Sequence, residues 1–164
     1  MYTLRCTKKL LDRIKVSPDA SSPPPTTALG NWYATALFWK PQVALLVNER
    51  TLLPVLMPLA PATTLAARFP HVLATILAQH GADQVFIASE LAAMSEVSVA
   101  KTSNRSVVGT MNEFAFLADA YRGHMETTDL IALSMRLADT PCGALKHDYP
   151  ARLLAEVFGS SMSH

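Results

Sequence analysis

The stretch NWYATALFWKPQVALLV, residues 31–47, decides the fold class of this chain. Its first arm, to Trp39, is rich in aromatic and β-compatible residues, its second arm, from Gln42, is aliphatic, and Lys40-Pro41 separates them. Two such arms around a short break are typical of an antiparallel hairpin. Because the second arm is almost entirely apolar, we expect it to lie in the middle of a sheet.

Further elements are predicted on both sides of this hairpin. Tyr2, Leu4 and Cys6 alternate with other residues, as in a half-buried strand, and residues 8–15 have the spacing of a short amphipathic helix. Residues 51–57 are apolar but interrupted by proline, so they are compatible with a strand or with a single helical turn. Apolar spacing predicts helices over residues 63–80, 83–94, 103–121, 129–137 and 148–158, and a strand over residues 96–101.

Together these elements predict an α+β fold, in which a small, mainly antiparallel sheet of about four strands packs against five or six helices. The chain of 164 residues has the length of one domain, so we predict a single domain over residues 1–164. The Pro- and Ser-rich segment at residues 17–28 is predicted to be a surface loop inside it, because the strand and helix before it are too small to form a core.

Composition limits the functional classes. Half of the residues are apolar and 16% are charged, which excludes long disorder. The low share of charged residues suits an oligomer or a chain with a covered apolar patch. The net charge of +1 argues against a broad electrostatic footprint for DNA or anionic lipid, but it leaves a local basic patch open.

The cysteines and the apolar stretches indicate a cytoplasmic protein. Cys6 and Cys142 are the only cysteines and form neither a disulfide framework nor a paired metal-ligand motif. No apolar run follows the basic residues near the N-terminus, so no secretory signal is expected. The uncharged apolar stretch at residues 51–67 is too short and too rich in proline for a membrane span.

One segment has the residue types of an anion site: Lys101-Thr102-Ser103-Asn104-Arg105-Ser106. It joins a predicted strand to the start of a predicted helix, where unpaired backbone amides and two cations suit phosphate or carboxylate. The alternative is that Ser103 or Asn104 only caps the helix, while Lys101 and Arg105 project into water. The segment lacks the glycines of a phosphate-binding P-loop.

Two other groups of residues have both a functional and a structural interpretation. The thiol of Cys6, close to Lys8 and Lys9, suits a nucleophile of lowered pKa, but its alternation with Leu4 favours a buried core cysteine. Trp32 and Tyr33 suit stacking on a base, although such aromatics more often lie in the core.

The remaining polar residues add little. Asn48 is most simply a turn residue, and the histidines lack the spacing of a metal site. We therefore expect neither a metal nor a cofactor.

Four blocks of the sequence resemble a family of small bacterial proteins that is classed only as a domain of unknown function. The blocks are CTKKLL (residues 6–11), NWYA (31–34), NERTL (48–52) and KTSNRSVVGTMN (101–112), and the resemblance extends from the first strand to about Tyr121. It implies a cytoplasmic bacterial protein of one domain and brings no activity, cofactor or catalytic residue. It also suggests that the polar blocks act together at one edge of the sheet.

These observations support three hypotheses for function. The first is a binding or regulatory module for a phosphate-bearing ligand, either a nucleotide or RNA. The second is a metal-independent nuclease or nucleotide-processing enzyme of toxin-like type, for which the sequence offers no clear general base. The third is a homo-oligomeric interaction protein without a small-molecule site. The candidate ligand-binding residues are Lys8, Lys9, Trp32, Tyr33, Asn48, Lys101, Thr102, Asn104, Arg105 and Ser106.

Overall fold

The computed structural model describes residues 1–124 and 129–162, and its strands form one mixed sheet. The strands are β1 (Tyr2–Cys6), β2 (Trp32–Leu37), β3 (Val43–Asn48), β4 (Pro54–Pro58) and β5 (Val97–Lys101). The α-helices are α1 (Lys8–Ile14), α2 (Leu65–Gln79), α3 (Gln84–Ala93), α4 (Arg105–Arg122), α5 (Leu130–Ala138) and α6 (Pro150–Met162), and the short 3₁₀ helices are η1 (Ala62–Thr64) and η2 (Gly143–Leu145). The predicted α+β fold is confirmed.

The sheet has the strand order β4-β3-β2-β1-β5. The predicted hairpin is confirmed, since β2 and β3 pair antiparallel with Trp32 opposite Asn48 and Leu37 opposite Val43. The ambiguous stretch after it forms β4, which pairs antiparallel with β3. Both neighbours of β1, the strands β2 and β5, run parallel to it, so the sheet has a parallel half and an antiparallel half.

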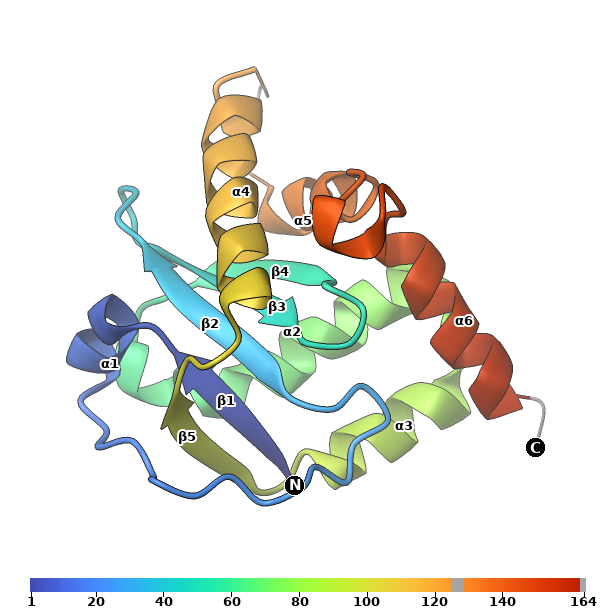
Figure 1. The fold of residues 1–164 in the computed structure, drawn as a ribbon, viewed down its shortest axis with the longest axis horizontal. Coiled ribbons are helices and arrows are strands. Elements are labelled where there is room, and N and C mark those ends of the chain that lie inside the picture. The colour runs from blue at the N-terminus through green and yellow to red at the C-terminus, as the bar shows by residue number, and fades with distance from the viewer. Residues whose placement is uncertain (125–128, 163–164) are drawn as a thin grey trace.

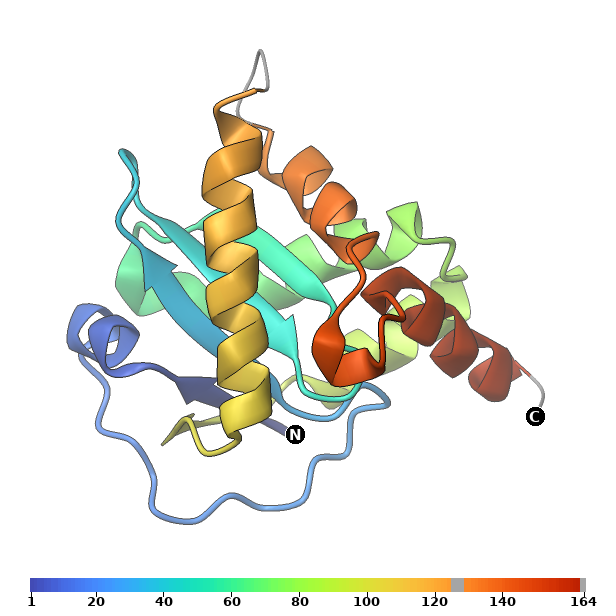
Figure 2. The same ribbon diagram turned by 45° about the horizontal axis from the view of Figure 1, so that its top comes forward.

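Helices cover both faces of the sheet. Figure 1 shows α4 crossing one face, with α5 beside it, while α2 crosses the opposite face. Side chains of successive strand residues point to opposite faces, so Trp32 packs into the core beneath α2, and Tyr33 packs into the second core beneath α4. The helix α4 extends over β2 and β3, so that helix leaves β1 and β5 uncovered on its face (Figures 1 and 2).

Both edge strands are protected from pairing with another chain. At β4, the backbone N–H of Leu56 donates to the hydroxyl of Ser134 in α5 at 2.8 Å. At β5, the N–H of Asp19 donates to the carbonyl of Val99 at 2.7 Å, and Ser98 donates to the Asp19 carboxylate at 2.8 Å. Figures 1 and 2 show the proline-rich segment running around the sheet beside β5, so this loop shields an edge that would otherwise favour aggregation.

None of the helices in the described ranges is long and apolar enough to cross a membrane.

Candidate functional site

The parallel half of the sheet points three strand ends in one direction. The neighbouring strands β2, β1 and β5 run in one direction and end at Leu37, Cys6 and Lys101. Lys101 is level with Cys6, whereas β2 continues three residues beyond Ala34, the partner of Cys6, so the residues after these ends form a stepped row along one edge of the sheet. Ligands of open α/β sheets commonly bind outside the carboxyl ends of parallel strands. We call this row the carboxyl edge.

A pocket of about 500 Å³ opens at the carboxyl edge, between α1, the start of the proline-rich segment and the end of β5. We call it the α1–β5 pocket, and its volume is in the range of small-molecule sites. Lys8 enters it from the first turn of α1 and Lys101 from the last position of β5. The other lining residues are Cys6, Leu11, Asp12, Val16, Ser17, Pro18 and Thr102.

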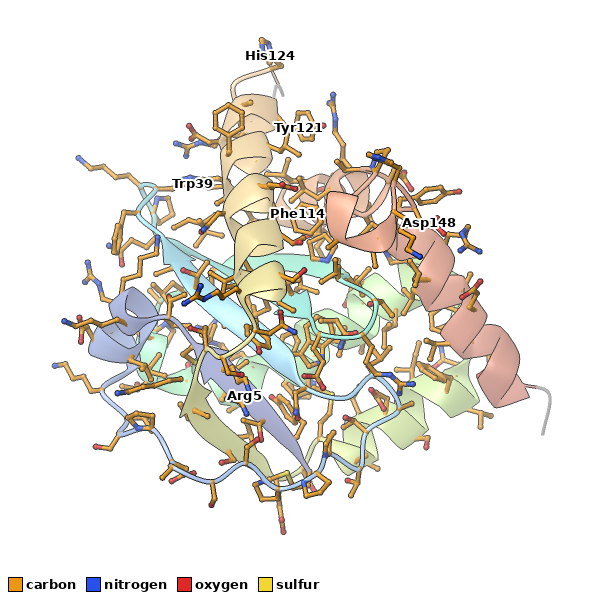
Figure 3. All side chains as sticks on the ribbon, in the orientation of Figure 1. Arg5, Trp39, Phe114, Tyr121, His124 and Asp148 are labelled. Carbon is orange, nitrogen blue, oxygen red and sulfur yellow. The ribbon has the colours of Figure 1, made fainter. Side chains whose placement is uncertain are left out.

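Two smaller hollows adjoin the segment that follows β5. One, of about 410 Å³, is lined by Arg5, Lys101 and Thr102 among others, and the Arg5 guanidinium donates to the Lys101 carbonyl at 2.9 Å. Figure 3 shows Arg5 over β1 and β5, on the face that α4 leaves uncovered. The second, of about 400 Å³, is lined by Thr102, Asn104 and Arg105. Lys101 and Arg105 therefore border different hollows, with Thr102 between them.

Backbone amides at the start of α4 are already hydrogen-bonded within the protein. The side chain of Asn104 accepts from the N–H groups of Ser106 and Val107 at 2.9 and 3.2 Å. The Asn104 N–H donates to the Tyr33 hydroxyl at 3.0 Å, and that hydroxyl also bonds to Ser103. The capping interpretation of Asn104 is thus confirmed. An anion here would be held by side chains rather than by helix amides.

Tyr33 is therefore a positioning residue, because its ring is buried under α4 and only its hydroxyl reaches the segment after β5. Lys101, Asn104, Arg105 and Ser106 are exposed.

Trp32 and Asn48 lie at the opposite end of the sheet. They face each other across the hairpin, where β2 begins and β3 ends. Trp32 is 1% exposed and packs edge-on against Phe69 at 5.0 Å between ring centroids, so no base can stack on it. The polar blocks of the sequence therefore do not meet at one edge, since antiparallel pairing brings the NERTL block to the start of β2 and away from Lys101.

Asn48 organises this opposite end. Its amide group donates to the carbonyls of Leu29 and Asn31 at 2.8 and 3.3 Å. Its carbonyl oxygen accepts from the N–H groups of Arg50 and Thr51 and from the Thr51 hydroxyl, all at 3.0 to 3.1 Å. Every polar atom of this fully buried side chain has a partner, which is the arrangement of a structural residue.

A buried carboxylate that the sequence prediction missed completes this network. Glu90, in α3, is 2% exposed, and its two oxygens accept from the N–H groups of Ala28 and Leu29 at 2.7 and 3.0 Å. Burial raises the pKa of Glu90, although the two backbone hydrogen bonds and the nearby Arg50 oppose the shift. The signal was present in the sequence, because Glu90 shares the buried face of α3 with Phe86 and Ile87.

Cys6 lines the α1–β5 pocket but is only 1% exposed. Burial raises the pKa of its thiol to about 12, so the thiol is neutral at physiological pH. The interpretation of Cys6 as a buried core cysteine is confirmed, and proximity to Lys8 and Lys9 does not make it a nucleophile.

Phe38 is a surface aromatic that the sequence prediction did not single out. It follows the last paired residue of β2 and is 55% exposed. The Lys9 ammonium and the Arg13 guanidinium lie over its ring at 5.7 and 5.5 Å from the centroid. In the sequence, Phe38 alternates in phase with the buried Trp32 and so resembles a core residue. Only the strand pairing shows that the ladder between β2 and β3 stops at Leu37, one residue before Phe38.

The described residues hold no group of three or more His, Cys, Asp and Glu side chains that could bind a metal ion.

Comparison with known proteins places the chain in a family without giving it an activity. No curated protein and no solved structure matches the chain. Residues 3–153 match the family described as Domain of unknown function (DUF6933), a longer range than the four sequence blocks cover. The chain thus belongs to the DUF6933 family.

Proposed function

We propose that this protein is a binding module that holds a phosphate-bearing ligand in the α1–β5 pocket. The observation that carries the proposal is that Lys8 and Lys101, from two separate elements, line one pocket at the carboxyl edge. Two ammonium groups on the wall of one concavity supply the charge and the hydrogen-bond donors that a phosphate group needs.

The charge distribution supports this location. The first fifty residues contain seven Lys and Arg and three Asp and Glu, whereas the rest of the chain contains seven and ten. The ion pairs formed within residues 1–124 and 129–162 lie in α4 and around the start of α6, and none involves Lys8 or Lys101. A cation that no acid neutralises is available to a ligand, and the positive end of the chain steers anions toward the pocket.

The pocket walls suit more than a bare anion. Leu11 and Val16 give it an apolar side that accommodates a base or sugar, and Ser17 and Thr102 add hydroxyl donors. Asp12, on the same wall, disfavours the deepest approach of a second negative charge. This combination favours a nucleotide-like ligand over inorganic phosphate.

Binding is favoured over catalysis, because the neutral Cys6 thiol is a poor nucleophile. Among the residues that line the α1–β5 pocket, Asp12 is the carboxylate that the nuclease hypothesis could use as its base. If the protein releases nucleotides from RNA in the presence of EDTA, and Asp12→Asn abolishes that release, the protein is a nuclease rather than a binding module.

The test is a titration with a fluorescent ATP analogue at low salt, using Lys8→Gln, Lys101→Gln and a matched control. We expect each substitution to weaken binding about tenfold, because each removes a charged hydrogen-bond donor. The control is Lys146→Asn, which removes an exposed cation just after η2. Lys146 has a left-handed backbone conformation, and asparagine tolerates that conformation. Equal affinity for all four proteins, or no binding by any, would refute the proposal.

A further inference from the structure

Phe38 is an aromatic ring held outward at the carboxyl edge by charge rather than by a hydrophobic core. More than half of its surface is exposed, and Lys9 and Arg13 of α1 hold their cations over the ring. A protein gains little stability from an exposed ring of this kind, because the ring removes little apolar area from water.

Its neighbours and the other exposed rings lack this combination. The adjacent Trp39 packs beside α4, and the Arg122 guanidinium covers its face at 4.1 Å from the centroid (Figure 3). Phe116, on α4, is 75% exposed, but no cation lies over its ring among the described residues. Among the exposed aromatics in the described ranges, Phe38 is therefore the one with cations over its ring, whereas Trp39 and Tyr121, which also have one, are half-buried.

Phe38 and the α1–β5 pocket are parts of one surface. Phe38 follows the end of β2, the pocket lies between α1 and the end of β5, and β1 separates these two strands in the sheet. Two strand spacings, about 10 Å, separate the two features across the sheet, and Phe38 lies four residues, about 13 Å, further along the strand direction than Ala34, which is level with Cys6 and Lys101. The helix α1 spans this interval, with Lys9 beside Phe38 and Lys8 in the pocket. We call the set Phe38, Lys9, Lys8 and Lys101 the aromatic–cationic row.

From this row we infer that the ligand of the α1–β5 pocket is a single-stranded nucleic acid, with one base stacked on Phe38 and its phosphates along Lys9, Lys8 and Lys101. Proteins that bind single strands without sequence preference combine a cationic track for the backbone with aromatic platforms for the bases. A single nucleotide fills the pocket without reaching Phe38, whereas a strand of a few nucleotides contacts both. This inference rests on the proposed function and extends it to a class of ligand.

The test measures fluorescence anisotropy of a labelled uridine dodecamer at low salt, with a thymidine dodecamer as the DNA arm and UTP as the single-nucleotide arm. The variant Phe38→Leu keeps apolar bulk but removes the π face, and we expect about tenfold weaker dodecamer binding. Phe38→Tyr retains an aromatic ring and should restore most of the affinity. The matched control is Phe116→Leu, an exposed ring away from the carboxyl edge.

The outcomes separate the inference from the proposed function. Weaker dodecamer binding by Phe38→Leu but not by Phe116→Leu, with UTP affinity unaffected by either, supports the inference. Dodecamer binding that is insensitive to Phe38→Leu overturns it. UTP binding that depends on Lys101, without tighter binding of either dodecamer, overturns it and leaves the proposed function in place. Absence of binding by UTP and by both dodecamers overturns both.

Discussion

The two ends of the parallel strands β1 and β2 use polar residues in opposite ways. At the amino end of β2, Asn48 and Glu90 are buried and their hydrogen-bonding atoms are satisfied by backbone groups. At the carboxyl edge, Lys8 and Lys101 line an open pocket and take part in no ion pair within the described ranges. Both ends contain residues of the four sequence blocks that carry the family resemblance. Their environments show that the first end holds the fold together, whereas the cations of the second line an open hollow.

Substitution of Asn48 should have the largest effect on stability. Asn48→Ala leaves the Leu29 carbonyl and the Thr51 N–H without their partners inside the protein. We expect the free energy of unfolding, measured in urea, to fall by about 3 kcal/mol. Asn112→Ala, at an exposed position of α4, is the control. If both variants lose the same free energy of unfolding, the buried Asn48 network does not stabilise the amino end of β2.

The pH dependence of stability should show the contribution of the buried Glu90 carboxylate. Because burial raises its pKa above the unfolded value, the native state holds this proton more tightly. The stabilisation from this group is complete below the unfolded pKa and is lost as the pH rises through the folded pKa. Glu90→Gln cannot titrate, so the stability of the natural protein minus that of Glu90→Gln should decrease with pH. An increase would mean that the hydrogen bonds from Ala28 and Leu29 outweigh burial.

Tyr33 connects the core to the segment after β5, so its substitution should have an intermediate effect. Tyr33→Phe removes the acceptor of the Asn104 N–H, and we expect a loss of about 1 kcal/mol of stability. Hydrogen exchange at the Asn104 amide should become faster. Tyr149→Phe, at a partly exposed tyrosine, should change neither quantity. Unaltered exchange at Asn104 in Tyr33→Phe would show that this hydroxyl does not position the segment.

The smallest effect on stability is expected at the carboxyl edge. Lys101→Gln should change the free energy of unfolding by less than about 0.5 kcal/mol, because the side chain is exposed and forms no ion pair in the described ranges. Arg50→Gln, which removes a hydrogen bond to the Ala28 carbonyl, is the comparison at the amino end and should cost about 1 kcal/mol. A larger loss for Lys101→Gln would give Lys101 a structural role.

The sequence predicts the parts of this comparison that depend on local patterns. The hairpin follows from the two β-forming arms around Lys40-Pro41, and the cap at Asn104 follows from the residue type at a helix start. The parallel pairing of β1 is not visible in the same way, because alternation with a period of two is identical for parallel and antiparallel strands.

The partners of polar residues depend on contacts between distant parts of the chain. Glu90 binds backbone groups about sixty residues earlier in the sequence, and no local pattern indicates them. For the same reason, both Trp32 and Lys101 are candidate ligand contacts in the sequence, although Trp32 is in the core and Lys101 is on the surface.

NMR distinguishes residue by residue whether the carboxyl edge or the amino end receives the ligand. Amide chemical shifts would be followed by ¹⁵N–¹H correlation spectra while UTP is added to the natural protein. We expect saturable changes centred on Lys8, Lys101 and Thr102, with Asn31 and Asn48 unaffected. Changes centred on Asn48, or no saturable change at any amide, would contradict this expectation.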